Sequence, residues 1–279
     1  MESGLRDVRG PSALGGGSRR FFDLLYLISV TEFKKTYFGT VLGYVWSLLR
    51  PLMLFGVLLF VFTRIFRVGS EVNNYPVLLL FNIVLFSFFQ EASTGAVASV
   101  VNQEGIVRKT QFPRLVIPLA VVLTSLFNFG VNLIVVLIFI LAFGVDPTWT
   151  WLCFPLVVAL LLLFTTAVAM ILSSLYVRFR DLGIIWGVLV TVLFYATPIL
   201  YTLDLPQVQG TTRDLILLNP LTPLFEQARD WIIDPSAPGA LAAAGDWLHL
   251  APSILIYVAV CAFSVWIFNR EAPRVAEEL

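Results

Sequence analysis

Six long, nearly uninterrupted apolar runs restrict this chain more than any other feature of its sequence. They cover residues 40–66, 75–101, 115–143, 152–177, 182–201 and 250–268. A helix of about 20 apolar residues crosses the hydrocarbon of a bilayer. Backbone groups in hydrocarbon need hydrogen bonds within the chain, and the runs lack the alternation of barrel strands, so helices are expected. The sequence therefore predicts an all-α integral membrane protein with six transmembrane helices.

The composition agrees with a membrane protein. Of the 279 residues 58% are hydrophobic and 13% are charged, and the mean hydropathy is +0.89. A soluble domain usually carries about 25% charged residues. Because the net charge is zero, the chain offers no basic surface for nucleic acid.

Positive charge is divided unevenly between the two sides of the predicted bundle. With the N-terminus inside, the cytoplasmic flanks hold 13 Lys and Arg residues and the opposite flanks hold 4. Cytoplasmic loops carry such an excess. We therefore expect a multi-pass protein of the bacterial plasma membrane, with both termini in the cytoplasm and membrane lipids around it.

The segments before the first run differ in character. Residues 1–18 are rich in Gly and are predicted to be a disordered cytoplasmic tail. Residues 19–38 mix apolar and charged side chains, which favours an amphipathic helix in the membrane interface. Residues 39–279 then form one six-span transmembrane domain.

A cationic loop separates the second and third runs, at residues 102–118. Gly105 and Pro113 punctuate it, so it has room for one short helix. A soluble partner could push or pull such a helix from the cytoplasm. The residues expected to make that contact are Gly105, Arg108, Lys109, Phe112, Pro113 and Arg114. In the alternative interpretation, the three cations only anchor topology and bind anionic headgroups.

The longest external connection, residues 202–249, contains a further apolar stretch. Pro220 and Pro223 suit the first turn of a helix that runs to about Ile233. One face of that helix repeats apolar residues at helical spacing, namely Leu221, Leu224, Phe225, Ala228 and Ile232. The opposite face carries Glu226, Arg229 and Asp230. The helix is too short to cross, so we expect an external re-entrant gate between spans five and six.

Four polar residues interrupt the apolar runs. Arg50 lies close enough to the cytoplasmic side for its guanidinium to reach the membrane interface. We favour this interfacial position over a functional role within the span. Glu91 lies deeper and should pair across helices or line a wet pathway. Asn128 and Asn132 are one turn apart, where hydrogen bonds between helices are the simplest role.

The remaining polar features carry little chemistry. Arg178, Arg180 and Asp181 form a short cytoplasmic turn, which topology anchoring explains. We find no metal-ligand spacing and no Gly-x-x-x-x-Gly-Lys-Ser/Thr phosphate loop. We expect no catalytic residue, metal or cofactor in this chain, and energy for uphill transport would have to come from another subunit.

Five segments in succession resemble permeases of polysaccharide and teichoic-acid ABC exporters. They are residues 39–51, residues 88–114, residues 176–182, residues 197–201 and residues 218–223. The external gate residues carried over from that family are Pro198, Tyr201, Asn219, Pro220, Pro223 and Phe225. Arg50 departs from the polar amide that we expect before the proline in this family.

The resemblance implies a half-transporter that forms a homodimer. Two separate ATPase subunits, which bind ATP and Mg, would dock on its cytoplasmic face. The cargo would be a lipid-linked polysaccharide or polyol-phosphate polymer of the cell envelope, such as O-antigen or teichoic acid. Arg outnumbers Lys by 15 to 3, which hints at a GC-rich genome and at cell-wall galactan as cargo.

Three other functions remain open from the sequence. The chain could be an ABC permease that exports a drug or a small lipid. It could be a membrane glycosyltransferase or polymerase, although its loops are poor in the catalytic groups that such enzymes need. It could also be a passive channel, which would need no ATPase contact.

Overall fold

The computed structural model describes residues 18–37, 43, 45–66, 72–103, 105 and 113–271. Every regular element in these ranges is a helix, and they contain no β-strand. The expected disordered tail lies outside the described residues, apart from its last residue. Arg108, Lys109 and Phe112 of the expected coupling loop also lie outside them.

Five helical segments in the described ranges are long and apolar enough to cross a membrane. They are α2 (Val45–Phe60) with the π-helix η1 (Val61–Ile65), α3 (Tyr75–Val97), α6 (Val116–Ala142), η3 (Trp149–Cys153) with α7 (Phe154–Tyr176), and α12 (Trp247–Glu271). These match the first, second, third, fourth and sixth apolar runs. The chain is therefore an all-helical, multi-pass membrane protein.

The fifth apolar run forms a shorter helix than expected. α8 (Leu182–Ala196) has 15 residues, which gives a length of about 22 Å against about 30 Å of hydrocarbon. The backbone becomes extended at Thr197, with φ −90° and ψ 143°. Thr197 precedes Pro198, and a following proline disfavours helical dihedrals. A membrane crossing by this fifth run, and with it the total of six spans, stays a prediction.

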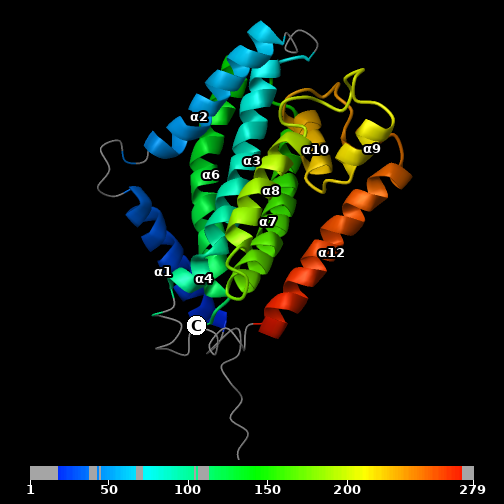
Figure 1. Ribbon diagram of the computed structural model, residues 1–279. Helices are drawn as coiled ribbons and strands as arrows, with labels where there is room; N and C mark the ends of the chain where they lie inside the picture. The colour runs from blue at the N-terminus through cyan, green and yellow to red at the C-terminus, as the bar shows by residue number, and fades with distance from the viewer. Residues whose placement is uncertain are drawn as a thin grey trace, which may run out of the picture.

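Helix α3 forms the centre of the bundle. In its most apolar stretch 78% of residues are buried, compared with 6% for α2–η1 and 22% for α12. It packs against α6 and α7 and also contacts α2 and α8 (Figure 1). Helices α2 and α12 therefore present most of their apolar side chains outward, where lipid or a partner would cover them.

The N-terminal helix α1 (Ser18–Tyr37) forms where the amphipathic helix was predicted. It packs against α6, where the rings of Phe33 and Phe127 meet edge to face. The Thr124 hydroxyl donates a hydrogen bond of 3.2 Å to the Ser29 carbonyl. The helix is confirmed, and its position in the membrane interface stays a prediction.

The connections divide between the two ends of the bundle (Figure 1). One end holds the start of α1, the short helix α4 (Ser99–Asn102) and the turn between α7 and α8. The other end holds α9 (Thr211–Leu217), α10 (Thr222–Ile232) and α11 (Ala240–Ala244). We call these the α4 end and the α10 end. The charge distribution predicts that they are cytoplasmic and external, respectively.

A close approach of α3 to α6 generates the first prediction. A Cβ atom at Gly95 would lie 2.9 Å from Cγ1 of Val121, whereas a Cβ at Gly130 of α6 meets nothing within 4 Å. Gly95→Val should lower the stability by ~1–3 kcal/mol relative to Gly130→Val, because overpacking forces the helices apart. Thermal unfolding in detergent, followed by circular dichroism, measures the difference. Equal midpoints for the two variants would contradict this packing.

Candidate functional site

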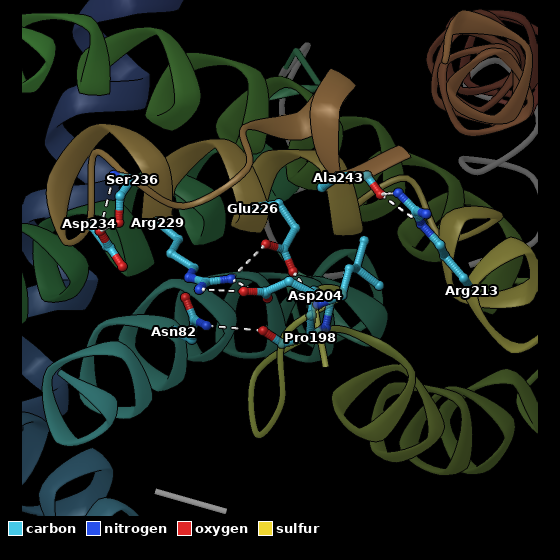
Figure 2. A network of polar contacts seen from close by, with 10 residues as sticks. Asn82, Pro198, Asp204, Arg213, Glu226, Arg229, Asp234, Ser236 and Ala243 are labelled. Atoms are coloured by element: carbon cyan, nitrogen blue, oxygen red, sulfur yellow. Dashed lines mark hydrogen bonds and ion pairs between the residues drawn. The ribbon is translucent and has the colours of Figure 1, made fainter. Parts of the chain in front are cut away.

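An irregular stretch at residues 197–205, here called the external strap, follows α8 and lies against the α10 end of the bundle. Two buried side chains of α3 hold it. The Tyr75 hydroxyl donates to the Leu200 carbonyl at 3.0 Å, and Nδ2 of Asn82 donates to the Pro198 carbonyl at 3.0 Å (Figure 2). Side chains of α3 thus donate hydrogen bonds to strap carbonyls that lie outside any helix. Pro198 and Tyr201, two predicted gate residues, belong to this strap.

Helix α10 holds the strap from its other side through charged groups. The Leu203 amide donates to Oε1 of Glu226 at 3.1 Å. The Arg229 guanidinium makes two parallel bonds to the Asp204 carboxylate, at 2.7 and 3.1 Å (Figure 2). Its Nη1 also lies 3.5 Å from Oε2 of Glu226. One cation therefore serves two acids that come from different segments.

This network corrects the predicted polar face of the gate helix. Glu226 and Arg229 are only 2% and 4% exposed, although helical spacing placed them opposite the apolar stripe. The stripe itself is buried as predicted, including Phe225 and Leu221. Both faces of α10 are covered, because the strap supplies Asp204 and the Leu203 amide to the polar face. Asp230 donates nothing to this network and accepts from Gln227 instead, at 2.8 Å.

Asn219 joins three elements at the α10 end. Its Nδ2 donates to the Thr197 hydroxyl at 2.8 Å, its Oδ1 accepts from the Leu221 amide at 3.0 Å, and its carbonyl accepts from the Ser253 hydroxyl of α12 at 3.2 Å. The predicted gate residue thus lies at the junction of strap, α10 and α12. The helix begins at Thr222, with Pro223 in its first turn and Pro220 just before it.

Burial and pairing separate the two acids electrostatically. Burial raises the pKa of Glu226 to about 7, although Arg229 and the Leu203 amide act in the opposite direction. Burial also acts to raise the pKa of Asp204, but the hydrogen bonds and charge of Arg229 outweigh it and hold the pKa at about 2. With these pKa values, at neutral pH Asp204 is the ionised partner of Arg229 and Glu226 is partly protonated.

A cavity of about 400 Å³ adjoins the strap. Asp204, Gln209 and Arg213 supply its polar lining. Nε of Arg213 donates to the Ala243 carbonyl at 2.8 Å, which ties the start of α9 to α11 (Figure 2). The cavity has the size of a small-ligand pocket, and its lining residues belong to the external connection.

A second group of polar residues lies inside the spans, and we call it the mid-span cluster. Nδ2 of Asn128 donates to Oε1 of Glu91, which joins α6 to α3. Ser125 also hydrogen-bonds the Glu91 carboxylate, and the charge of Arg50 attracts it. Asn132 donates to the Asn128 carbonyl of its own helix at 2.9 Å. The structure thus brings all four sequence-predicted polar residues of the spans into one region.

The mid-span cluster lies deep in the bundle and opens onto its surface. Asn128 is 12 residues from the start of α6 and 14 from its end, which places it about 18 and 21 Å from those ends. Along the whole of α3 only Gln90, Glu91, Thr94 and Gly95 are exposed. The core helix therefore shows one polar window, at the level of the cluster.

The described part of the predicted coupling loop lies at the α4 end. Gly105 is exposed, Pro113 is buried and Arg114 is half-buried. Burial lowers the pKa of the Arg114 guanidinium from its usual value. Arg178 and Arg180 lie at the same end, each over an aromatic ring, of Phe179 and Tyr176, respectively. Asp181 is exposed in the same turn.

Sequence reasoning missed several residues that hold the external strap in place. Tyr75 and Asn82 lay within an apolar run, and nothing singled out Asp204 within residues 202–249. An isolated Asn in a span is a signal that could have identified Asn82, since such a group needs a partner inside the protein. Nothing in the local sequence pairs Asp204 with Arg229, 25 positions later.

The chain is similar to known proteins over most of its length. A family model described as ABC-2 type transporter matches residues 23–232. An O-antigen export system permease protein RfbA from Klebsiella pneumoniae is 32% identical over 259 residues, which cover 92% of this chain and 95% of that protein. A protein of the same description from Myxococcus xanthus is 33% identical over 202 residues, covering 72% of this chain and 77% of that protein.

The buried acid Glu226 generates a prediction about pH. Its pKa is about 7 in the folded chain against an ordinary value of 4.5, so the folded chain binds this proton more tightly than the unfolded chain. Stability from this group should therefore rise by ~3 kcal/mol as the pH falls from about 7 towards 4.5, and be lost as the pH rises through 7. Asp204, whose pKa is lowered to about 2, acts oppositely, below its ordinary pKa.

The matched variant is Glu226→Gln, which keeps the size of the side chain and one acceptor oxygen and removes the titration. Chemical or thermal unfolding in detergent at a series of pH values should show a slope between pH 4.5 and 7 that is smaller in the variant than in the parent chain. Other acids titrate equally in both proteins and cancel in the comparison. Parallel profiles would mean that Glu226 titrates as an ordinary glutamate.

Proposed function

This chain belongs to the ABC-2 type transporter family, and on that premise we propose that it is the membrane permease subunit of an exporter of cell-envelope polysaccharide. The observation that carries the proposal is its similarity to O-antigen export permeases over nearly the full length of both chains. The cargo is a polysaccharide or polyol-phosphate polymer carried on a lipid, and it moves from the cytoplasmic to the outer face of the bacterial inner membrane.

The energy for export comes from a separate subunit. Members of an ABC transporter system work with an ATPase, and we propose that two copies dock at the α4 end of a homodimer of this chain. ATP and Mg then bind the partner and not this chain. Helices α2 and α12, which bury little of their apolar surface within one chain, leave ample area for contact between two copies.

The route of the polymer follows the polar window of α3. Gln90, Glu91 and Thr94 are exposed on a helix that is otherwise enclosed, and a polar chain needs hydrogen-bonding groups where it passes the hydrocarbon. The external strap and α10 lie beyond this window, at the α10 end (Figure 1). In this role they form the outer gate. The contacts of Arg229 with Asp204 and Glu226 limit how far the strap can move away from α10.

Export generates a direct prediction. Deleting the gene for this chain in its host should leave lipid-linked polymer inside the cell and remove polymer from the surface, and the wild-type gene on a plasmid should restore the surface polymer. Polymer on the outside is measured with a lectin or antibody on intact cells, and total polymer after lysis. Unchanged surface polymer in the deletion strain would overturn the proposed function. Loss of total polymer would point to a synthetic role instead.

A second prediction concerns the coupling loop at residues 105–114. Phe112→Ala should weaken co-purification of the ATPase and lower export, because it removes an apolar anchor without changing any charge. The double variant Arg108→Glu, Lys109→Glu should do the same if these cations pair with acids of the ATPase. Arg64→Glu, on the opposite side by topology, is the control. Full ATPase binding and full export in both test variants would rule out this loop as the coupling element.

A further inference from the structure

The cavity beside the external strap is lined by two charged side chains that do not pair with each other. The Asp204 carboxylate is bonded to Arg229, at 2.7 and 3.1 Å. Nε of Arg213 donates instead to the Ala243 carbonyl at 2.8 Å (Figure 2). Asp204 and Arg213 nevertheless line the same space of about 400 Å³. A ligand with groups that suit both charges fits between them.

Each of these two side chains is held by its partner and keeps capacity for another hydrogen bond. A carboxylate has about four lone-pair sites, and Arg229 takes two of those on Asp204. The Asp204 side chain is 41% exposed, so a ligand can reach the remaining sites. The Arg213 guanidinium uses Nε and Nη2 on the carbonyls of Ala242 and Ala243, and Nη1 remains as a donor. Polar groups that are already fixed bind a ligand at a lower cost in entropy.

Gln209 adds a neutral polar group to the lining. Its side chain is exposed at the cavity and makes no hydrogen bond with any residue in the described ranges. A carboxamide both donates and accepts hydrogen bonds. Apolar walls complete the lining, from Leu205, Val208 and Pro238 among others. A few polar groups on apolar walls are the arrangement that orients a small ligand.

This lining selects a neutral ligand that is rich in hydroxyl groups. A hydroxyl group donates and accepts, so it can bond to a carboxylate, a carboxamide and a guanidinium. Asp204 repels an anionic ligand, and Arg213 repels a cationic one. The C–H groups of a sugar ring suit the apolar walls. Resting on the proposed function, we propose that this cavity binds one neutral sugar unit of the exported polymer at the outer face of the membrane.

The experiment measures sugar binding to the purified full-length chain. The protein is kept in a polyoxyethylene detergent, which carries no sugar headgroup. The probe is the set of oligosaccharides that mild acid releases from the surface polymer of the host, and glycerol 3-phosphate is the anionic counterpart. Saturation-transfer NMR detects the binding, and titration gives the affinities. We expect the oligosaccharides to bind saturably and glycerol 3-phosphate to bind more weakly.

Two glutamines of the same connection give a matched pair of variants. Gln207 and Gln209 are both exposed, but only Gln209 lines the cavity. Gln209→Leu should lower the affinity about fivefold to tenfold, because a hydrogen bond is lost, and Gln207→Leu should bind like the parent chain. Ala242→Phe, at an exposed residue of the lining, should abolish binding by filling the cavity. Unfolding midpoints and gel-filtration profiles show whether each variant is folded.

The binding data decide whether the cavity is a sugar site. Absence of saturable oligosaccharide binding to the parent chain would overturn it. Equal affinities of the parent chain and the folded Gln209→Leu and Ala242→Phe variants would place the sugar elsewhere and overturn it as well. Glycerol 3-phosphate that binds more tightly than the oligosaccharides, and is lost in Ala242→Phe, would make the cavity an anion site and overturn its assignment to a neutral sugar.

The site and the proposed function fail separately. Sugar binding that depends on Gln209, together with unchanged surface polymer in the deletion strain, would reject the proposed function and keep the site. Loss of surface polymer in the deletion strain, together with absent oligosaccharide binding, would reject the site and keep the proposed function.

Discussion

Backbone groups that leave a helix beside an apolar bundle need hydrogen bonds from the protein itself, and this need organises the α10 end of the molecule. The chain leaves α8 after 15 residues because Pro198 follows Thr197. The side chains of Tyr75 and Asn82 in α3 donate to two of the released carbonyls, and Glu226 of α10 accepts from the Leu203 amide. In hydrocarbon each unsatisfied group costs several kcal/mol. The strap and α10 therefore form one unit with the core helix.

Two arginine–acid groups in the described part of the chain differ in burial and in direct contact. Arg229 is enclosed and forms two bonds to Asp204. Removing one partner of such a pair leaves an uncompensated charge inside, which is the usual source of large losses of stability. Arg50 is exposed and attracts Glu91 without a direct bond, while neutral amide and hydroxyl groups satisfy that acid. The first group holds the strap against α10, whereas Arg50 lies exposed on α2.

Apolar runs and prolines predicted five spans, a helix ending near Ile233 and its apolar stripe, because helix length and periodicity are properties of neighbouring residues. Periodicity says which residues share a face and not what covers that face. Helical spacing therefore placed Glu226 and Arg229 opposite the apolar stripe, but it could not show that a strap more than 20 positions earlier covers them. The pairing of Glu91 with Asn128 had the same limit: both residues stood out in the sequence, but their contact depends on how α3 packs against α6. The central position of α3 could not be predicted either, since its composition resembles that of the exposed α2.

One continuous helix connects every part of the molecule to which a role has been assigned. α3 extends for about 33 Å from Tyr75 to Val97. It holds the strap through Tyr75 and Asn82 near one end, presents the polar window around Glu91, and approaches α6 closely at Gly95 near the other end. The short helix α4 and the predicted coupling loop follow directly. A helix buried on nearly all sides moves as a rigid body, because its neighbours resist bending at close packing. A displacement at the α4 end must therefore reach the strap through α3 or break the contact at Gly95. The close approach of α3 to α6 at Gly95 therefore lies on the helix that joins the two ends.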